Sequence, residues 1–317
     1  MEQAAAARST VFGLDVYSAM PLSFLEGPSA KPTGRALELS LQAGDAVEPD
    51  WPASAELVCD EHLPDGSVLF QIEAHPEAGF LISGPRYGAY LLSGDGLRLR
   101  CAPAGHPDDV WQRFLIAQVL PFAALLHGLE VFHASAIVHD GKAVAFIGPS
   151  HAGKTSVALE LCRRGATFLT DDVLAVERVG EDLLGYPGTP VAGLDHSEAQ
   201  RIERTEGAQH HEIVASNPRE WVVRMRGATE PASLGALFIL DRGPGGPSRP
   251  SFELAGEPRL LLAATFNSVI TAPSRLRGLL DICALAARLP VERILAGPDV
   301  DAAELASAIE RRLGAAP

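Results

Sequence analysis

Short runs in which hydrophobic and polar residues alternate fill the first third of the chain, from about residue 10 to residue 104. Glycine, proline and aspartate separate the runs, a pattern that is typical of β-strands joined by tight turns. The clearest runs cover residues 11–14, 37–41, 68–72, 79–82 and 87–92. They predict a small β-rich amino-terminal domain over residues 1–104, which we interpret as a packing module or as the part that recognises an acceptor.

The hydrophobic pattern changes at residues 103–109, a stretch of turn-forming and acidic residues, and we place a domain boundary there. A helix is predicted from about residue 109 to residue 128. Its most apolar part contains Gln118 and His127 and is shorter than the roughly 20 apolar residues that cross a bilayer. We therefore expect a buried helix here and no membrane partner.

Strands and helices alternate after this helix, so residues 105–317 are predicted to form an α/β domain. Two strands are joined by a hairpin turn at Asp140 and Gly141, and the helix after the second strand stops at Gly165. The predicted strands cover residues 131–138, 143–147, 167–170, 221–226 and 234–240, and the predicted helices cover residues 156–164, 256–288 (with a break allowed at Pro273) and 301–313.

Composition and charge narrow the class of protein. Of the 317 residues, 47% are hydrophobic, which excludes a disordered chain, and a formal net charge of −14 would repel nucleic acid and anionic lipid. The four cysteines are scattered without a Cys-x-x-Cys pair, which argues against a disulfide framework or a zinc site. The first residues carry no basic segment followed by an apolar stretch, so a cytoplasmic location is expected.

A glycine-rich segment supplies the strongest candidate chemistry. Residues 148–155 match the pattern G-x-x-x-x-G-K-[ST], between a predicted strand and a predicted helix. Glycines let backbone N–H groups turn toward a phosphate, the start of a helix attracts negative charge, and a threonine hydroxyl in this place ligates Mg²⁺. The segment therefore predicts a site for ATP or another nucleoside triphosphate with Mg²⁺. The predicted nucleotide-binding residues are Gly148, Pro149, Ser150, His151, Ala152, Gly153, Lys154, Thr155 and Ser156.

The carboxylates that such a site needs follow at the end of the next predicted strand. One residue of the pair Asp171 and Asp172 can hold Mg²⁺ while the other takes the proton from an attacking hydroxyl, because adjacent residues at a strand end point in different directions. The residues alone leave open which of the two is the base. His133, on the strand that leads to the loop, is by itself better explained as a core histidine.

The stretch from His133 through the glycine-rich segment to the aspartate pair resembles the catalytic domain of HPr kinase/phosphorylase and its kinase-like relatives. His133 stands 15 positions before the first loop glycine, and the aspartates stand 17 and 18 positions after Lys154, as in that family. The resemblance implies a P-loop fold of the HPr-kinase-like (PEP carboxykinase-like) type and ATP-dependent transfer of a γ-phosphoryl group to a serine hydroxyl. By this resemblance Asp171 is the base, and Lys154 and His133 lie at the phosphates. Thr155 and Asp172 would serve Mg²⁺.

Two departures separate the chain from true HPr enzymes. It has Gly-Tyr-Pro-Gly-Thr-Pro at residues 185–190 in place of the Glu-Ile-Arg-Gly-Leu-Gly run of that family, so we do not expect HPr itself as acceptor or the reverse phosphorolysis. His151 stands where the family usually has glycine. If that position needs a positive φ, histidine tolerates it better than most residues do.

The whole chain resembles a branch of HPr-kinase-like proteins that have a β-rich amino-terminal domain, a helix ending in Leu-Leu-His-Gly and a His-Ala-Ser-Ala strand, here at residues 125–128 and 133–136. That branch includes kinases of ribosomally made peptides (RiPPs), notably lasso-peptide precursors, so a precursor peptide with a serine near its carboxyl end is the favoured acceptor. HPr enzymes assemble as hexamers, which makes a homo-oligomer one expectation. Two alternatives stay open: a small-molecule kinase on the same fold, and a nucleotide-binding regulatory module without transfer chemistry.

Overall fold

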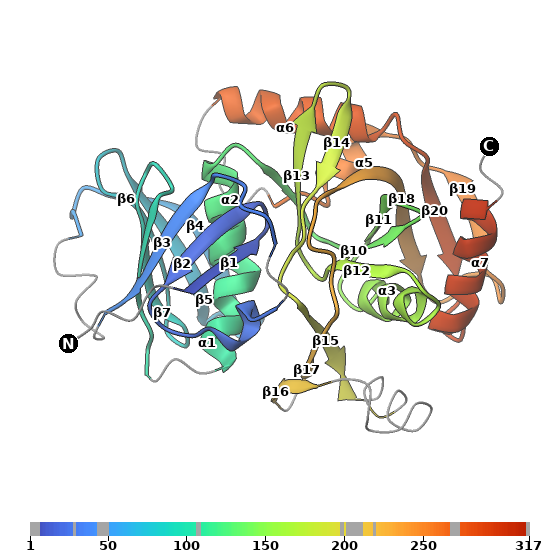
Figure 1. Cartoon of the computed structure of the whole chain (residues 1–317), viewed down its shortest axis with the longest axis horizontal. Helices are drawn as coiled ribbons and strands as arrows, with labels where there is room; N and C mark the ends of the chain where they lie inside the picture. Colours follow the sequence, from blue (N-terminus) through green and yellow to red (C-terminus); the bar gives the residue numbers. More distant parts are fainter. Residues whose placement is uncertain are drawn as a thin grey trace. The chain divides into compact units, whose positions relative to one another are not determined.

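The computed structural model describes residues 7–27, 30–42, 51–105, 109–196, 200, 212–217, 220–266 and 273–314 (Figure 1). The chain forms two compact units, which are Met1–Leu129 with Asn267–Thr271 and Glu130–Phe266 with Ala272–Pro317. The hydrophobic pattern predicts a boundary after residue 104, whereas the compact units divide after Leu129. The difference arises because the helix that begins at Asp109 packs against the strands of the first unit.

An eight-stranded sheet makes up most of the first unit, with the strand order β1-β2-β3-β8-β7-β6-β5-β4. β3 pairs in parallel with β2 and with β8, and the other pairs are antiparallel. The strands are β1 (Ala7–Val11), β2 (Leu14–Ser18), β3 (Ala36–Leu41), β4 (Glu56–His62), β5 (Val68–His75), β6 (Gly79–Gly84), β7 (Gly88–Leu92) and β8 (Arg98–Ala102), and a short 3₁₀ helix, η1 (Ser23–Leu25), follows β2. The predicted β-rich amino-terminal part is therefore confirmed.

A long helical segment packs on this sheet. It consists of α1 (Asp109–Phe114), a π-helical stretch η3 (Leu115–Val119) and α2 (Leu120–Leu126). The ring centroids of Phe70 and Phe114 lie 5.5 Å apart and those of Phe80 and Phe122 lie 5.0 Å apart, which joins both ends of the segment to the strands. The π-helical stretch precedes Pro121, which has no N–H and whose ring would clash with a carbonyl one turn earlier in a regular helix.

The same helical segment has the length and composition of a candidate membrane span. By length and composition alone, Asp109–Leu126 is the one helix among the described residues that is long and apolar enough to cross a membrane. Most of its residues are buried inside the structure, as in a core helix of a folded domain. The predicted buried helix is therefore confirmed, and Gly128, with φ of +82°, ends it in the expected way.

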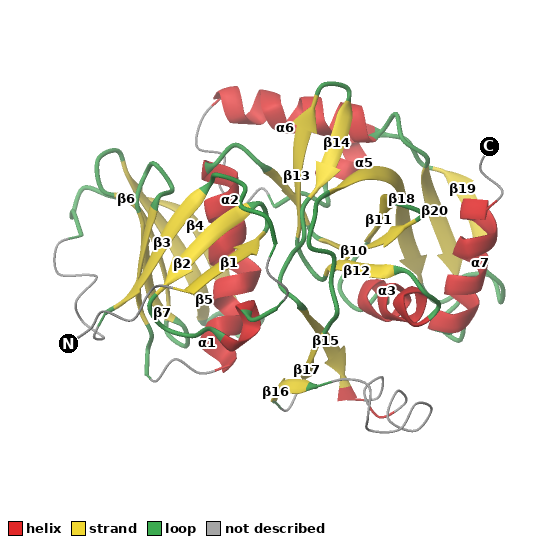
Figure 2. Ribbon diagram, in the orientation of Figure 1, coloured by secondary structure: helices red, strands yellow, loops and turns green. Residues whose placement is uncertain are grey.

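A nine-stranded sheet forms the centre of the second unit (Figure 2). Its main order is β12-β10-β11-β18-β14-β13-β9, while β20 pairs with β18 and β19 pairs with β20. The strands are β9 (Glu130–Phe132), β10 (Ala134–His139), β11 (Lys142–Ile147), β12 (Thr167–Thr170), β13 (Leu174–Val179), β14 (Asp182–Gly185), β18 (Ala232–Arg242), β19 (Ser251–Leu254) and β20 (Val291–Ala296). The single strand predicted over residues 131–138 is in fact divided into β9 and β10 at His133, whose N–H donates to the carbonyl of Ala264.

Helices lie on both faces of this sheet. Val144 and Phe146 of β11 belong to a hydrophobic core with residues of α3 (Lys154–Arg163) and α7 (Ala302–Gly314). The alternate residues Ala143, Ala145 and Ile147 belong to a second core with α5 (Pro258–Leu262) and α6 (Pro273–Ala286). Successive side chains of a strand point to opposite faces, so the unbroken hydrophobic run of β11 is what a strand buried on both sides needs. The predicted α/β architecture is thus confirmed.

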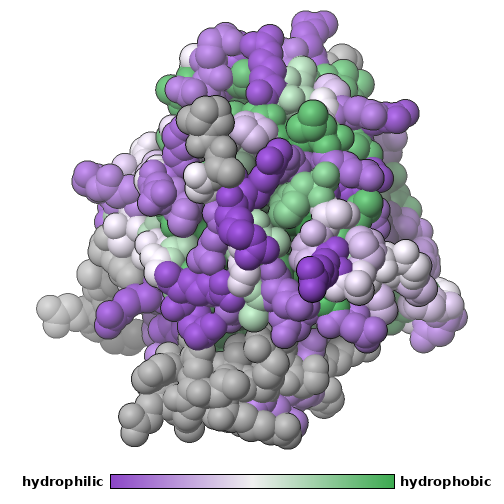
Figure 3. All heavy atoms as spheres, turned by 90° about the vertical axis from the view of Figure 1, so that its right-hand side faces the viewer, coloured by the Kyte–Doolittle hydropathy of each residue, from purple (hydrophilic) through white to green (hydrophobic). Residues whose placement is uncertain are grey.

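The helices after residue 256 follow the prediction in type and differ in extent. The predicted segment 256–288 contains α5 and α6, while residues 267–272 lie outside the described part of the chain. α7 ends with Arg311 and Arg312 and has Glu304 in its first turn, which suits the helix dipole. Figure 3 looks onto the side of the second unit that carries α7 and β19, where hydrophilic residues are interspersed with smaller hydrophobic areas.

A three-stranded sheet, β15-β17-β16, completes the second unit. Its strands are β15 (Val191–Asp195), β16 (Ile213–Ser216) and β17 (Glu220–Arg224). Leu159 of α3 packs in one core with Leu194 of β15 and Val223 of β17. This packing brings β15 beside the helix that follows the glycine-rich loop.

Candidate functional site

The glycine-rich segment forms a loop between β11, which ends at Ile147, and α3, which begins at Lys154. Gly148 and Gly153 have φ of +150° and +90°, in the region that favours glycine. A Cβ on Gly148 would lie 2.7 Å from the carbonyl oxygen of Leu240 in the neighbouring strand β18, so a side chain at this position would force the backbone to move. The strand, loop and helix are the context that the phosphate-binding pattern requires.

His151 also adopts a left-handed backbone conformation, with φ of +63°. The position that glycine usually fills in the resembling family thus does need a positive φ, and histidine is among the residue types that adopt it. Its side chain is exposed, away from the buried part of the loop. The loop therefore keeps its bend with histidine in place of glycine.

The first turn of α3 offers backbone donors to an anion. The first four N–H groups of an α-helix have no acceptor within the helix. Gly153 is the residue before α3, and no side chain caps the helix there. These N–H groups and the positive end of the helix dipole make the start of α3 suitable for binding phosphate.

Lys154 is buried, with 6% of its surface exposed, and its ammonium group lies under the loop. Nζ donates to the carbonyl oxygens of Gly148 at 3.1 Å and Pro149 at 3.3 Å, and it lies 3.3 Å from Nε2 of His133. Burial lowers the pKa of Lys154, while the carboxylates of Asp172 and Asp171 raise it. The lysine is therefore held in place at the loop by groups that phosphate oxygens can replace.

The hydrogen bonds of His133 determine which ring nitrogen carries the proton. Nδ1 lies 3.0 Å from the carbonyl oxygen of Asp172, which can only accept, so Nδ1 is the protonated nitrogen. Nε2 then accepts from the ammonium group of Lys154. Removal from water and the positive charge of Lys154 lower the pKa of His133, against the effect of Asp172. His133 is thus a neutral imidazole that orients Lys154 and is not a core histidine.

Asp171, at the end of β12, is buried with 4% of its surface exposed. Its Oδ1 accepts hydrogen bonds from the hydroxyls of Ser135 at 2.6 Å and Thr155 at 2.8 Å. Its Oδ2 accepts the backbone N–H of Gly193 in β15 at 3.0 Å. The carboxylate therefore joins β10, α3 and β15, and it lies against the loop threonine that the motif assigns to Mg²⁺.

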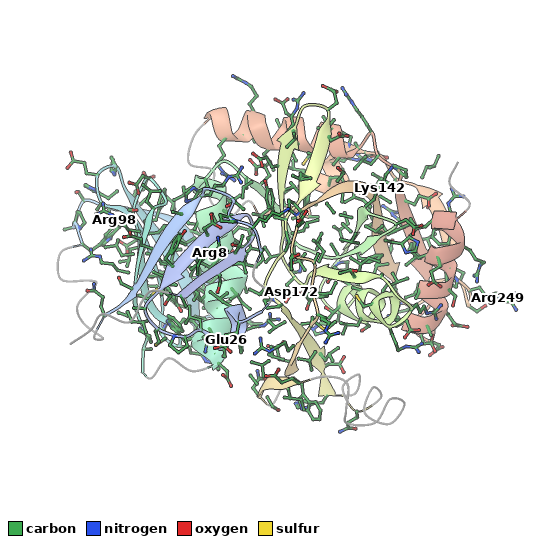
Figure 4. The ribbon with its side chains drawn as sticks, viewed as in Figure 1. Arg8, Glu26, Arg98, Lys142, Asp172 and Arg249 are labelled. Carbon is green, nitrogen blue, oxygen red and sulfur yellow. The ribbon has the colours of Figure 1, made fainter. Side chains whose placement is uncertain are left out.

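Asp172 occupies a strained turn directly after β12, where Figure 4 labels it. Its φ is +61°, and the N–H of Val173 donates to the carbonyl of Asp171 across it at 2.7 Å. A three-residue turn with a positive φ at its centre is rare and strained. Its carbonyl also accepts the N–H of Ala134 at 3.2 Å, which fixes the turn to β10. Strain of this kind concentrates at functional sites.

The donor set fits a magnesium ion bound together with a nucleotide. Among the described residues, no group of three or more His, Cys, Asp or Glu comes together to hold a metal ion alone. Mg²⁺ prefers oxygen ligands and is usually bound by one or two protein oxygens together with phosphates and waters. Thr155 and the two aspartates supply hard oxygens of this type at the start of α3.

The structure brings the predicted residues His133, Lys154, Thr155, Asp171 and Asp172 together at one end of the parallel strands, as the spacing indicated. Ligands of open α/β sheets bind at this edge. The sequence interpretation did not single out three further residues here, which are Ser135, Gly193 and Arg242. Of these only Ser135 carried a signal, as a hydroxyl among the apolar residues of the predicted strand.

Known proteins resemble the chain over part of its length, and no family model matches it. HPr kinase/phosphorylase of Prosthecochloris aestuarii is 38% identical over 67 residues, which is 21% of this chain and 19% of that protein. The protein of the same name from Chlorobium phaeobacteroides is 36% identical over 64 residues, or 20% of this chain and 19% of that protein. The chain thus matches about a fifth of the length of these curated relatives.

A solved structure, the Hpr(Ser) kinase/phosphatase of Coxiella burnetii, matches 58% of this chain and 93% of its own, with 15% identity and a TM-score of 0.31. The sequence matches confirm the resemblance to HPr kinase/phosphorylase that the motif spacing predicts. That resemblance extends over about a fifth of the chain.

Proposed function

We propose that the chain is an ATP-dependent kinase that requires Mg²⁺ and transfers the γ-phosphoryl group to a serine hydroxyl of a peptide or protein. The observation that carries this proposal is the Thr155–Asp171 hydrogen bond of 2.8 Å beside the buried ammonium group of Lys154. A glycine-rich loop, a lysine, a threonine and an aspartate in this arrangement are the parts of a P-loop phosphoryl-transfer site. The similarity to HPr kinase/phosphorylase supports the same chemistry.

The loop and Lys154 would bind the phosphates. Nζ of Lys154 would exchange the carbonyl oxygens of Gly148 and Pro149 for phosphate oxygens, while Nε2 of neutral His133 still accepts a hydrogen bond from it. An ammonium group with three donors can keep one protein contact and turn the other two to the nucleotide. The N–H groups at the start of α3 add donors to the same phosphates.

Thr155 and Asp171 would form the metal side of the site. Mg²⁺ would supply positive charge against the negative charge of the phosphates. The hydroxyl of Thr155, which donates a hydrogen bond to Oδ1 of Asp171, would keep its lone pairs for the ion. Ser135 and Gly193 hold that carboxylate in place. The resemblance assigns Asp172 to the metal, and these hydrogen bonds favour Asp171 instead.

Asp172 would then be the base. Its negative charge acts on both Lys154 and His133, while that of Asp171 acts on Lys154. In the transfer step the acceptor oxygen forms a bond to the γ-phosphorus, the bond from that phosphorus to the bridging oxygen of ADP breaks, and the hydroxyl proton passes to the carboxylate. The positive φ of Asp172 directs its side chain differently from that of Asp171.

For the acceptor we favour a serine near the carboxyl end of a ribosomally made precursor peptide, such as a lasso-peptide precursor. This preference comes from the sequence resemblance, and a homo-oligomer stays a prediction from the same source. The curated relatives are named for HPr, a protein acceptor, which agrees with a peptide or protein acceptor here. Small-molecule alcohols are the competing acceptor class.

The test is incubation of the full chain with Mg²⁺ and ATP in the presence of serine-ended precursor peptides, followed by intact mass measurement. A gain of one phosphate on a peptide is the expected result. The gain should disappear in Asp172→Asn and persist in Asp182→Asn, a matched change at an exposed position on β14.

Two other results would redirect the proposal. Consumption of ATP with a small alcohol and none with peptides would establish a small-molecule kinase on this site. Tight binding of ATP without consumption with any acceptor would establish a regulatory nucleotide-binding module and contradict the transfer chemistry.

A further inference from the structure

Three parallel strands end together at the phosphate-binding loop. β11 runs into the loop, β18 is its parallel neighbour, and β20 is the parallel neighbour of β18. In this pairing Ile147, the last residue of β11, is opposite Ile239, so β18 continues past the start of the loop to Arg242. Arg242, the last residue of β18, thus lies at the edge at which nucleotides bind in sheets of this kind.

The guanidinium group of Arg242 lies directly against the loop. A Cβ built on Gly153 would lie 2.9 Å from Nη1 of Arg242, so the cation covers the residue immediately before Lys154. Gly153 is also the residue from which α3 starts, with no side-chain cap. A second positive charge therefore stands next to the uncapped N–H groups at the start of α3.

Contacts to the backbone hold this arginine in place. Nη2 donates to the carbonyl oxygens of Pro298 at 3.1 Å and Val300 at 2.5 Å, in the segment between β20 and α7. Both partners are neutral carbonyls, so they fix the direction of the guanidinium group without neutralising its charge. Side chains whose rotamers are locked in this way make good ligands, because little motion is lost on binding.

One donor of the same group is left without a partner. Nε of Arg242 is buried and has no hydrogen-bond acceptor among the described residues. A buried N–H without an acceptor is costly, and such a group in a folded protein calls for a missing partner. Nη2 is already bound to two carbonyls, so Nη1 is the donor that faces Gly153 and can reach a phosphate oxygen there.

We propose that Arg242 is a second phosphate-binding cation of this site, in which Nη1 donates to the phosphate chain of the nucleotide at Gly153 while Nη2 stays on the 298–300 segment. The proposal rests on the proposed function, since it names a ligand of the same nucleotide. Lys154 and Arg242 would then be two cations that bind the same phosphate chain.

The test is calorimetric titration of the full chain with Mg-ATP and, separately, with inorganic pyrophosphate. Arg242→Gln should bind both ligands at least about tenfold more weakly than the wild type, the worth of one charge-assisted hydrogen bond. Arg242→Lys keeps the charge and loses the contacts of Nη2 to the 298–300 segment, so its affinity should lie between those of the wild type and Arg242→Gln. Arg293→Gln is the matched control, because Arg293 lies on the adjacent strand β20 and faces Asp241 at 3.9 Å instead of the loop.

Thermal unfolding separates a phosphate ligand from a merely structural arginine. The Tm shift caused by pyrophosphate should shrink in Arg242→Gln relative to the ligand-free Tm of the same variant, whatever that ligand-free Tm is. If the wild type and Arg242→Gln bind both ligands equally, Arg242 is only a tether of the 298–300 segment and the inference is overturned. If the wild type binds neither ligand, the nucleotide site itself is overturned, and the assignment of Arg242 with it.

Discussion

The hydroxyl of Thr155 donates a hydrogen bond of 2.8 Å to Oδ1 of Asp171, which joins the first turn of α3 to the end of β12. The bond links the residue of the glycine-rich pattern that suits a metal to one member of the carboxylate pair. The two aspartates of this pair are held differently. Asp171 accepts hydrogen bonds from Ser135, Thr155 and Gly193, while Asp172 occupies a turn with a positive φ. Two adjacent aspartates thus have different surroundings and different proposed roles.

Replacement of each aspartate should have a distinct effect. Asp171→Asn should raise the Mg²⁺ concentration needed for half-maximal activity by about tenfold or more, as expected for loss of a residue that orients a metal ligand. Asp172→Asn should leave nucleotide and metal binding nearly intact and lower kcat by at least about 100-fold, the usual worth of a general base. Activity measured against Mg²⁺ concentration distinguishes them, and the reverse pattern would return the base to Asp171.

His133 should make stability depend on pH in one direction. Its pKa in the folded protein is below the ordinary 6.5, so below that pH the unfolded chain binds more protons than the folded one. The free energy of unfolding should therefore fall as the pH is lowered through 6.5.

Urea unfolding of the wild type and His133→Gln at several pH values measures this dependence. The variant should show a shallower fall than the wild type. An unchanged slope in His133→Gln would show that the imidazole does not stay neutral against Lys154.

Substitution of His151 tests whether the loop needs a residue that adopts a positive φ at this position. His151→Gly should change the free energy of unfolding by less than about 1 kcal/mol and preserve nucleotide binding, because glycine adopts a φ of +63° freely. His151→Val should lower it by about 1–3 kcal/mol, since a β-branched residue is a genuine outlier there. Denaturant unfolding and nucleotide titration measure both effects. Loss of binding in His151→Gly would mean that the imidazole itself takes part in the site.

Arg164 should stabilise the packing of α3 against α7, because it donates hydrogen bonds to residues of both helices. It donates to Glu160 at 2.8 Å, Glu310 at 2.9 Å and Ser307 at 2.8 Å, and the Glu160 carboxylate is buried. Arg164→Met should cost about 2–3 kcal/mol, because it leaves these acceptors short of a donor.

Arg288→Met provides the matched control. Arg288 pairs with Glu181 at 3.0 Å, but both side chains are more than 70% exposed, so its loss should cost at most about 1 kcal/mol. Equal Tm losses in the two variants would contradict the assigned role of Arg164.

Local patterns in the sequence predicted the phosphate-binding loop, the buried sheet and the β-rich amino-terminal part. The loop between β11 and α3 follows from its glycines and lysine, and the sheet buried on both faces follows from the apolar run of β11. The hydrophobic pattern also gives the β-rich amino-terminal part. In each case neighbouring residues in the chain carry the whole signal.

Contacts between distant segments were not predictable in this way. Gly193 reaches Asp171 only because β15 packs beside α3, and a glycine N–H leaves no mark in the sequence. The predicted strand over residues 234–240 ends before Arg242, whereas β18 runs to this residue because it pairs with β20 as far as Ala296. The extent of the first unit depended similarly on which sheet the helix after Asp109 packs against.

The central claim, a phosphate-binding site built around Lys154, is tested most directly by titration of the full chain with Mg-ATP. The wild type should bind, and Lys154→Met should lose detectable binding while it stays folded. Lys142→Met is the matched control, since Lys142 is another of the three lysines, is exposed, and lies at the opposite end of β11. Binding by the wild type and Lys142→Met but not by Lys154→Met is the predicted result. Equal binding by all three proteins, or by none, would contradict the account.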